Sequence, residues 1–224
     1  MRIGVLGTGS VGRALGGKLA ELGHEVMLGT RDVEALTARP AGERESESFS
    51  EWMERTPGAT VGTFAEAAAH GEMLFNCTRG EGSLDALASA DDRQVGGKVL
   101  VDVSNPLEFE EGAMKLFVPS GDSLAERIQR QHPHAKVVKA LNTVNARVMV
   151  DPAGVGGGDH TIFVCGDDEE AKAAVGEILR SFGWRHIMDL GDLSAARGME
   201  AYLLLWIRMM GAMGSPALNV KVVT

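Results

Sequence analysis

The chain has 224 residues, of which 44% are hydrophobic and 24% charged, a composition typical of a folded globular protein and not of a disordered one. Its formal net charge of −9 argues against nucleic acid or an anionic membrane surface as the main partner. The longest apolar run, residues 201–213, is shorter than the roughly 20 residues that a membrane-spanning helix needs, and it contains Arg208.

The first half of the chain alternates between short apolar runs and segments with helical spacing. Strands are predicted at 3–6, 25–29, 72–77 and 98–103, and helices at 10–22, 64–70 and 83–89. The polar stretch 32–60 has little periodicity, and within it we expect a short helix after Asp32, a loop at 43–48 and a further helix around 48–55.

The second half continues this alternation, with a helix at 124–131 and a strand at 136–141. After a glycine-rich loop we expect a strand at 160–166, a helix at 168–182, a short strand at 185–191, a long helix at 194–213 and a last strand at 217–223. Alternating strands and helices, with strands almost uninterrupted in apolar residues, predict an α/β fold whose parallel sheet is covered on both faces. We expect residues 1–150 to form the sheet domain and residues 151–224 a small C-terminal helical or α+β appendage.

The two cysteines indicate the cellular compartment in which the protein works. Cys77 and Cys165 both lie in predicted strands, which is typical of buried thiols in a reducing environment and not of a disulfide framework. The N-terminus passes directly into a strand, without the cationic and apolar segments of an export signal. We therefore expect a cytoplasmic protein.

Three glycines with G-x-G-x-x-G spacing, Gly7, Gly9 and Gly12, follow directly after the first predicted strand. In such a motif the first glycine allows a tight turn, the second lets the main chain approach a pyrophosphate, and the third lets the helix pack close to the strand. The helix N-terminus, at Ser10 and Val11, presents N–H groups and positive dipole to the phosphates. Because strand, motif, helix and second strand fall within about 30 residues, the sequence predicts a dinucleotide site in a doubly wound Rossmann sheet.

The residues after the second strand select the dinucleotide. An acidic residue there accepts hydrogen bonds from the adenosine ribose, whereas this chain has Thr30 and Arg31. A hydroxyl and a guanidinium suit a 2′-phosphate, and the guanidinium can bind it bidentately. Asp32 follows, and it either caps the next helix, which we favour, or contacts the ribose if the strand is one residue longer. The sequence thus favours NADP as the cofactor.

Three segments, GVLGTGSVGRALGGKLAELGHEVMLGTRD, KALNTVNARVM and FVCGDDEEAKAAVGEILRSFGWRHIMDLGDLSAARGMEA, resemble the NADP-dependent oxidoreductases of the deazaflavin coenzyme F420. The same motifs occur in the reductase domain of the six-transmembrane epithelial antigen metalloreductases. The resemblance covers nearly the whole chain except residues 32–60 and about 106–120. It implies an NADP-binding domain, hydride exchange with a flavin or deazaflavin ring, and a homodimer formed through the C-terminal helix.

The same resemblance implies which residues contact the cofactor: Thr8, Thr30 and Arg31 at the 2′-phosphate, Thr78 and Arg79 beside the pyrophosphate and ribose, and Ala140, Asn142 and Thr143 along the nicotinamide. One stretch departs from the archaeal deazaflavin enzymes. They carry a histidine and a proline where this chain has Asn142 and Asn145. These positions line the pocket of the second ring, so the identity of the acceptor stays open.

The predicted strand ends carry mainly neutral hydrogen-bonding groups: Thr78, Ser104, Asn105, Asn142, Thr143 and Asn145, with Arg79 as a cation. Such groups orient a carboxamide or a ring carbonyl, which suits hydride transfer between two stacked rings. A hydroxyacid or imine dehydrogenase needs instead a group that handles the substrate proton. Lys139 is the one candidate general acid, and we favour its interpretation as a strand residue directed to the edge of a face.

Three other features have structural interpretations that we prefer. His132 and His134 lack a cysteine or carboxylate at ligand spacing, so no metal is predicted. The acidic run 167–170 fits an N-cap with an acidic first turn. Apolar residues at helical spacing within 199–213 fit a core or dimer contact, and Trp206 among them is a candidate border of the second substrate.

These observations predict an NADP-dependent oxidoreductase that passes a hydride between NADPH and a flavin-like or deazaflavin acceptor. No catalytic acid–base residue is nominated; Asn105, Asn142 and Thr143 are the candidates for orienting the substrate, and Asn105 also for binding the cofactor. The alternatives are a small-substrate hydroxyacid or imine dehydrogenase, which usually carries a larger second domain, and an NADP-binding redox sensor without turnover.

Overall fold

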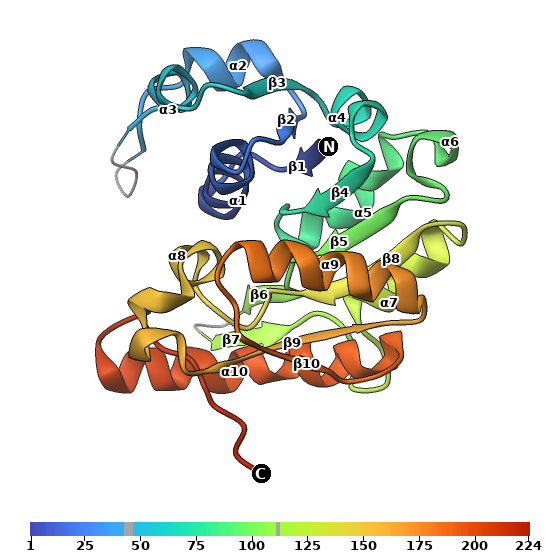
Figure 1. Cartoon of the computed structure of the whole chain (residues 1–224). Coiled ribbons are helices and arrows are strands. Elements are labelled where there is room, and N and C mark those ends of the chain that lie inside the picture. Colours follow the sequence, from blue (N-terminus) through green and yellow to red (C-terminus); the bar gives the residue numbers. More distant parts are fainter. Residues whose placement is uncertain (43–46, 111–112) are drawn as a thin grey trace.

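An eight-stranded sheet runs through the computed structural model, which describes residues 1–42, 47–110 and 113–224 (Figure 1). The strand order is β10-β9-β8-β5-β4-β1-β2-β3, and neighbouring strands are parallel except for the antiparallel pair β8 and β9. The bounds are β1 Arg2–Leu6, β2 Glu25–Thr30, β3 Ala59–Thr63, β4 Met73–Asn76, β5 Val99–Asp102, β8 Lys136–Ala140, β9 Thr161–Gly166 and β10 His186–Asp189. The predicted α/β class with a doubly wound, mostly parallel sheet is confirmed.

Helices cover both faces of the sheet. Their bounds are α1 Ser10–Glu21, α2 Val33–Ala38, α3 Phe49–Arg55, α4 Phe64–His70, α5 Gly80–Ala88, α6 Asp92–Val95, α7 Leu124–Gln131, α8 Ala146–Val150, α9 Glu169–Ser181 and α10 Ala196–Met213. Short 3₁₀ turns lie at Pro152–Gly154, Gly156–Gly158 and Leu193–Ala195, and a separate hairpin joins β6 Leu107–Glu110 to β7 Ala113–Leu116.

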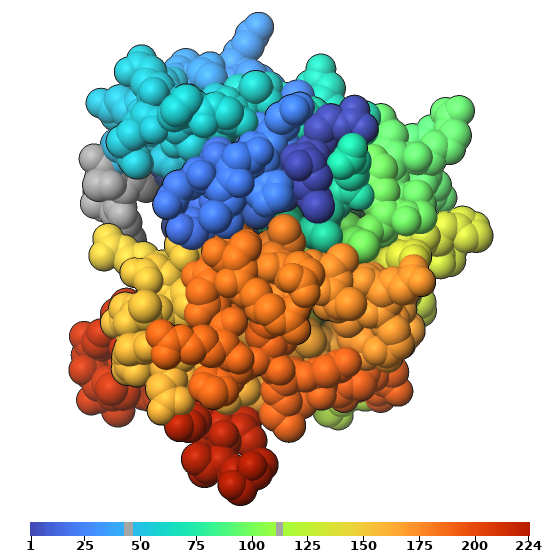
Figure 2. All heavy atoms as spheres, in the orientation of Figure 1, coloured from blue at the N-terminus to red at the C-terminus, as the bar shows by residue number. Residues whose placement is uncertain are grey.

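Two apolar cores result, one on each face of the sheet. The first core includes Leu15 of α1, Trp52 of α3 and Val175 of α9. Figure 2 shows α1 (blue) and α9 (orange) together on the face of the molecule that it draws. The second includes Leu87 of α5, Ile128 of α7 and residues at the start of α10. Because both faces are buried, the central strands can be nearly all apolar, which explains their sequence pattern.

Local sequence explains where several helices begin. Ser48 and Thr63 form capping boxes with Glu51 and Glu66, and in each the glutamate accepts the N-cap N–H at 2.7 Å. Asp168 accepts the N–H of Ala171 at 2.8 Å, which confirms the predicted cap of α9. A hydrogen bond from Lys136 and the cap itself hold the pKa of Asp168 below its usual value.

Most predicted elements are confirmed, two of them (64–70 and 124–131) to the residue. The helices at Val33–Ala38 and Phe49–Arg55 are also present; most of the predicted loop at 43–48 lies outside the described residues. The sequence did not predict β3, α6, α8 or the hairpin of β6 and β7. The division at residue 150 stays a prediction, and β9 and β10 extend the same sheet beyond it.

The predicted last strand at 217–223 is wrong, because no strand forms there. The tail lies beside the start of β9, where Thr161 donates its N–H to Val220 O at 2.9 Å. β8 pairs with β9 only over Val164–Gly166, so only the first residues of β9 are open to the tail on that side. In the described part of the chain, no helix is long and apolar enough to cross a membrane.

Candidate dinucleotide site

Two glycines of the motif are required by the protein itself. Gly7 has a φ of +118°, and a Cβ built on it lies 2.7 Å from the carbonyl oxygen of Cys77. A Cβ on Gly12 lies 2.0 Å from the carbonyl oxygen of Gly7, so α1 could not approach the turn with any larger residue. The turn is fixed between its neighbours because Gly7 donates to Gly29 O at 2.9 Å and Cys77 donates to Leu6 O at 2.8 Å.

Gly9 is different, because nothing in the described structure requires a glycine there. Its φ is −76°, which any residue adopts, and a Cβ built on it meets no atom within 4 Å. Gly9 is the N-cap of α1, and no side chain of the described residues caps this helix. Ser10 beside it is exposed, and Thr8 and Val11 are half-buried. The open space in front of the helix N-terminus therefore fits an anionic group that approaches the main chain.

This turn lies where the strand order reverses. β1 has β2 on one side and β4 on the other, and the chain proceeds outward from β1 through β2 and β3 before crossing to β4. In open α/β sheets, ligands bind outside the carboxyl ends of the strands at such a point. The loops after β1, β2, β4, β5 and β8 end at this edge, so all the predicted site residues leave the sheet on the same side.

Thr30 and Arg31 lie at the end of β2. β2 ends at Thr30, one residue later than the sequence suggested, and Thr30 pairs with Thr63 of β3. In a strand of this length we expected Asp32 to contact the ribose, but its carboxylate is committed to the next helix. Asp32 does cap α2, since its carboxylate accepts the N–H of Ala35 at 2.9 Å. Arg31 is exposed and forms no ion pair with any residue that the structure describes. Its guanidinium is therefore available to a ligand.

The loops after β4 and β5 carry the next predicted site residues, Thr78, Arg79 and Asn105. The Thr78 hydroxyl donates to Asn76 Oδ1 at 2.6 Å, and Arg79 is exposed at the N-cap of α5. Asn105 donates to the carbonyl oxygen of Asn142 at 3.0 Å, which joins the loop after β5 to the loop after β8.

The loop after β8 carries two buried polar atoms that lack a partner. The Asn142 amide donates to Asn105 Oδ1 and to Met199 O, each at 3.0 Å, so its own Oδ1 is left over. Asn142 Oδ1 and Thr143 Oγ1 have no hydrogen bond within the described structure, and both residues are 1% exposed. Buried polar atoms are normally satisfied, so this pair indicates a ligand with complementary hydrogen-bonding groups.

Ala140 and Leu141 precede this pair. Ala140 is buried, so it can offer a ligand only its backbone and methyl group. Leu141 is the only non-glycine residue with a positive φ in the described ranges, at +64°. Strained backbone of this kind persists where the surrounding structure imposes it, often at functional sites. Here it turns the chain sharply at the end of β8.

Lys139 is not at the edge of a face, and that expectation is wrong. Its side chain is fully buried, and Nζ lies 2.7 Å from Asp102 Oδ2 and 2.9 Å from Glu200 Oε1. Burial lowers the pKa of the ammonium, but the two carboxylates outweigh burial and hold the pKa above its usual value. Lys139 therefore stays protonated and is not suited to act as a general acid.

The residues around Lys139 were missed by the sequence analysis. Asn76, Asp102 and Lys139 are neighbours in register across β4, β5 and β8. The available signal was a polar residue near the end of each of three apolar runs. Burial, and after it the nearby Asp102 carboxylate, raises the pKa of the adjacent Cys77 thiol.

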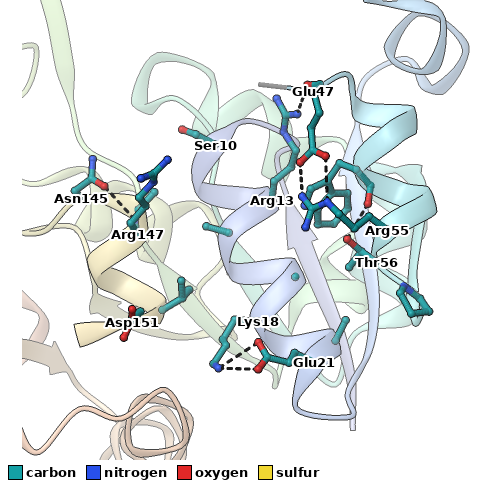
Figure 3. A pocket seen from close by; sticks show the side chains of 17 residues that line it. Ser10, Arg13, Lys18, Glu21, Glu47, Arg55, Thr56, Asn145, Arg147 and Asp151 are labelled. Carbon is teal, nitrogen blue, oxygen red and sulfur yellow. Dashed lines mark hydrogen bonds and ion pairs between the residues drawn. The ribbon is translucent and has the colours of Figure 1, made fainter. Parts of the chain in front are cut away.

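A groove of about 1160 Å³ lies beside this site (Figure 3). It runs along α1, with Arg13 and Lys18 on one side and Arg147 and Asp151 on the other. Only its end near Ser10 reaches the glycine turn. The open space at Gly9 and the atoms of the loop after β8 that have no partner among the described residues lie at the strand ends and not along this groove.

The remaining candidates lie elsewhere. His132 Nδ1 is 2.8 Å from Asp92 Oδ1, and within the described ranges no three His, Cys, Asp or Glu side chains form a group that could hold a metal ion. Trp206 is buried against Leu203 and Leu218, with Leu107 packed on the same cluster. Its Nε1 has no partner among the described residues.

Known proteins resemble this chain over most of its length. A family model described as "NADP oxidoreductase coenzyme F420-dependent" matches residues 2–106. The chain is 28% identical to the F420-dependent NADP reductase of Methanocaldococcus jannaschii, over 92% of this chain and 91% of that protein. It is 33% identical to metalloreductase STEAP3 of Rattus norvegicus over 89% of this chain, which spans only 36% of that longer protein.

Solved structures agree with these sequence matches. One solved crystal structure is that of a protein from Arthrobacter sp. FB24 whose name gives F420-dependent NADP reductase as its inferred function. Its sequence is 47% identical to this one over the whole of both chains, and the two structures superpose with a TM-score of 0.95. An imine reductase from Aspergillus terreus in complex with NADPH4 is only 16% identical, over 95% of this chain and 62% of that one, with a TM-score of 0.64, so it shows the fold alone. The chain belongs to the family of coenzyme F420-dependent NADP oxidoreductases.

Proposed function

We propose that this protein transfers a hydride between NADP(H) and the deazaflavin coenzyme F420. When bound, the nicotinamide supplies the hydride. The chain binds the two ring systems and aligns them. Its contribution to the reaction is to position the rings, because hydride transfer between stacked rings depends on distance and orientation more than on proton transfer.

The single observation that carries the proposal is the environment of Gly9. Nothing in the described part of the chain requires a glycine there, since its φ is ordinary and a Cβ would meet none of the described atoms within 4 Å. A glycine at this position is explained by a pyrophosphate that approaches the helix N-terminus, because the ligand then needs the space that a side chain would fill. Thr30 and the free guanidinium of Arg31 lie at the end of the neighbouring strand, where they suit a 2′-phosphate.

The chemistry of the site agrees with ring-to-ring transfer. Asn142 Oδ1 can accept a hydrogen bond from a carboxamide, and the Thr143 hydroxyl can donate one to a carbonyl; neither group, nor the Asn105 amide beside them, exchanges a proton at neutral pH. The buried ammonium of Lys139 is committed to two carboxylates. A hydroxyacid or imine dehydrogenase, which must handle a substrate proton, is therefore less well supported than hydride transfer to F420.

The proposal extends to the assembly and the compartment. We propose a homodimer that involves α10, because Leu204, Leu205 and Met213 are exposed on that helix, at 37%, 56% and 65%. A cytoplasmic location is supported by two free cysteines, of which Cys165 is buried. Burial also raises the pKa of the Cys165 thiol to about 12, so it stays protonated and unreactive.

The experiment is an acceptor comparison. The purified chain is mixed with NADPH, and NADPH oxidation is followed with F420, free flavins or a ferric chelate as the acceptor. We expect rapid oxidation with F420 and little with the other two. Rapid reduction of free flavin or ferric iron with none of F420 would contradict the deazaflavin assignment, and NADPH binding without turnover with any acceptor would favour a redox sensor.

A further inference from the structure

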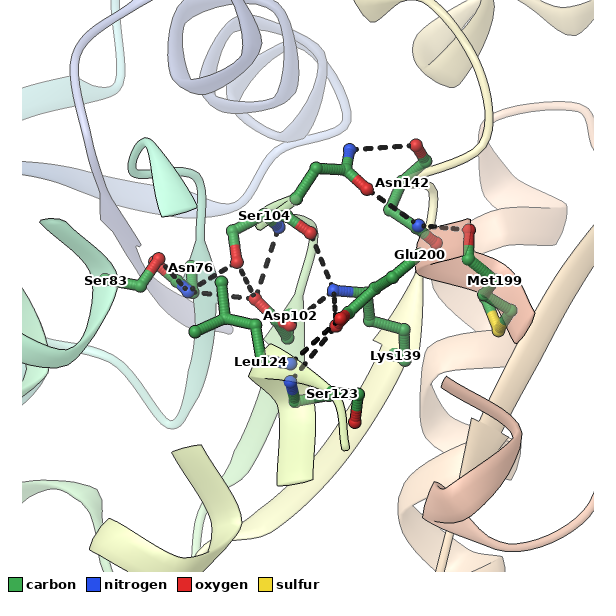
Figure 4. Close-up of polar contacts among 12 residues, drawn as sticks. Asn76, Ser83, Asp102, Ser104, Ser123, Leu124, Lys139, Asn142, Met199 and Glu200 are labelled. Carbon is green, nitrogen blue, oxygen red and sulfur yellow. Dashed lines mark hydrogen bonds and ion pairs between the residues drawn. The ribbon is translucent and has the colours of Figure 1, made fainter. Parts of the chain in front are cut away.

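Three buried charged side chains form a cluster directly beneath the loops of the site (Figure 4). Lys139 Nζ donates to Asp102 Oδ2 at 2.7 Å, to Glu200 Oε1 at 2.9 Å and to the carbonyl oxygen of Ser104 at 2.6 Å. Each of the three N–H bonds of the ammonium thus has an acceptor. We call Asp102, Lys139 and Glu200 the ion cluster. Such a cluster is stable in a core only when its charges are paired and its hydrogen bonds are made, as here.

The ion cluster holds the starts of two site loops. Asp102 Oδ1 accepts the hydroxyl of Ser104 at 2.7 Å and the amide of Asn76 at 2.9 Å. Asn76 Oδ1 in turn accepts the hydroxyl of Thr78 at 2.6 Å. The same row of side chains therefore fixes the loop after β4 and the loop after β5 at the point where each leaves the sheet.

The ion cluster also docks α10 against the strand ends. Glu200 accepts the N–H groups of Leu124 and Ala125 at 2.8 and 3.1 Å, so it caps α7 while it pairs with Lys139. The preceding residue, Met199, accepts the Asn142 amide through its carbonyl oxygen at 3.0 Å. With both of its N–H bonds committed, to Met199 O and to Asn105 Oδ1, the Asn142 amide can present only Oδ1 to a ligand.

We propose that the ion cluster is a positioning device for the nicotinamide half of the dinucleotide: by docking α10 at residues 199–200, it orients the amide of Asn142. The side chains of the ion cluster do not touch the ligand themselves. The adenosine half depends on other parts of the chain, since Gly9, Thr30 and Arg31 belong to the ends of β1 and β2. The inference rests on the proposed NADP site and is independent of the identity of the acceptor.

The test measures the contribution of the nicotinamide to binding. The affinities for NADP and for 2′-phospho-ADP-ribose, which lacks the nicotinamide ring, are measured by calorimetry on the wild type and on Glu200→Gln. Glutamine keeps the shape of the side chain and removes the charge that attracts Lys139. We expect the fragment to bind within about twofold of wild type and NADP to bind about fivefold more weakly, the effect of one displaced hydrogen bond.

The matched control is Arg197→Gln. Arg197 on α10 pairs with Glu126 on α7, with 2.9 Å between Nε and Oε2, so it joins the same two helices from the partly exposed surface. We expect Arg197→Gln to leave the ratio of the two affinities unchanged. Thermal unfolding of each variant checks that the chain is folded. If Glu200→Gln does not fold, Glu200→Asp, which keeps the charge but shortens the side chain that bonds Lys139 and the start of α7, is measured in its place with the same expected direction.

Three results would overturn the inference. An unchanged ratio in a folded Glu200→Gln would show that the ion cluster does not position the nicotinamide side. An equal fall of the ratio in Arg197→Gln would show that any weakening of the contact between α7 and α10 has this effect. Failure of the wild type to bind either molecule would instead refute the NADP site itself, and with it this inference.

Discussion

Replacing Arg31 with alanine should weaken the binding of NADPH and leave the binding of NADH nearly unchanged. The guanidinium lies at the end of β2, is exposed, and forms no ion pair with the described residues. No internal contact is therefore lost, and the free energy of unfolding should stay within about 0.5 kcal/mol of wild type. The effect of the substitution should appear only when a ligand carries a 2′-phosphate.

The magnitude follows from the type of contact. A hydrogen bond between charged groups contributes about 1.5–3 kcal/mol, and an exposed position screens it toward the lower end of that range. Since about 1.4 kcal/mol corresponds to a factor of ten, the KM for NADPH should rise by about 10–30-fold. Thr30 keeps a hydroxyl at the same strand end, so binding should be weakened and not abolished.

The assay is steady-state oxidation of NADPH and of NADH by the wild type, by Arg31→Ala and by Arg93→Ala. Arg93 lies on α6 and pairs with Asp91, so its substitution removes the same net charge away from the site. We expect a changed preference between the two cofactors only in Arg31→Ala. Equal losses for NADPH and NADH in that variant would refute the reasoning, because the guanidinium would then not distinguish the 2′-phosphate.

Three further predictions concern the turn, the ion cluster and pH. Gly9→Ala should leave the melting temperature nearly unchanged and strongly reduce NADP affinity by calorimetry, whereas Gly7→Ala, at φ +118°, should lose about 1–3 kcal/mol of stability; the reverse pattern would contradict our interpretation of the two glycines. Lys139→Met leaves two carboxylates buried without a cation and should cost about 3–5 kcal/mol in urea unfolding, so a neutral result would show that the ion cluster is not closed to water. Hydrogen bonds from Arg197 hold the pKa of Glu126 below its usual value, so the stability that this carboxylate contributes is complete at neutral pH and is lost as pH falls through the lowered pKa. Glu126→Gln should therefore lower stability at pH 7 by about 0.5–1 kcal/mol and have a smaller effect at acid pH, and an equal loss at both would contradict this origin.

The sequence was informative where the signal is local. The glycine motif predicts its own turn because two of its positions, Gly7 and Gly12, impose their requirements on the adjacent backbone, and the cap at Asp32 is likewise decided within four residues. Apolar runs predicted the central strands because both faces of the sheet are buried. β3 was missed because it is a short edge strand, Ala59–Thr63, with little apolar character, and it is defined by its partner β2.

The ion cluster could not be predicted from the sequence, because its members come from β5, β8 and α10. Periodicity places Lys139 on one face of a strand, but it does not say which helix covers that face. Only the packed structure shows that Glu200 reaches it. The unpaired oxygen of Asn142 is hidden for the same reason, since its amide is committed to Asn105 and to Met199, which is 57 residues away in the chain.

The central claim is that NADP lies across the carboxyl ends of the strands, and a crystal structure with NADP bound tests it most directly. We predict the pyrophosphate over Gly9 at the start of α1, the 2′-phosphate against Thr30 and Arg31, and the carboxamide within hydrogen-bond distance of Asn142 Oδ1 or Thr143 Oγ1. A nucleotide bound along the groove between α1 and α8, with the turn at Gly9 untouched, would contradict the account.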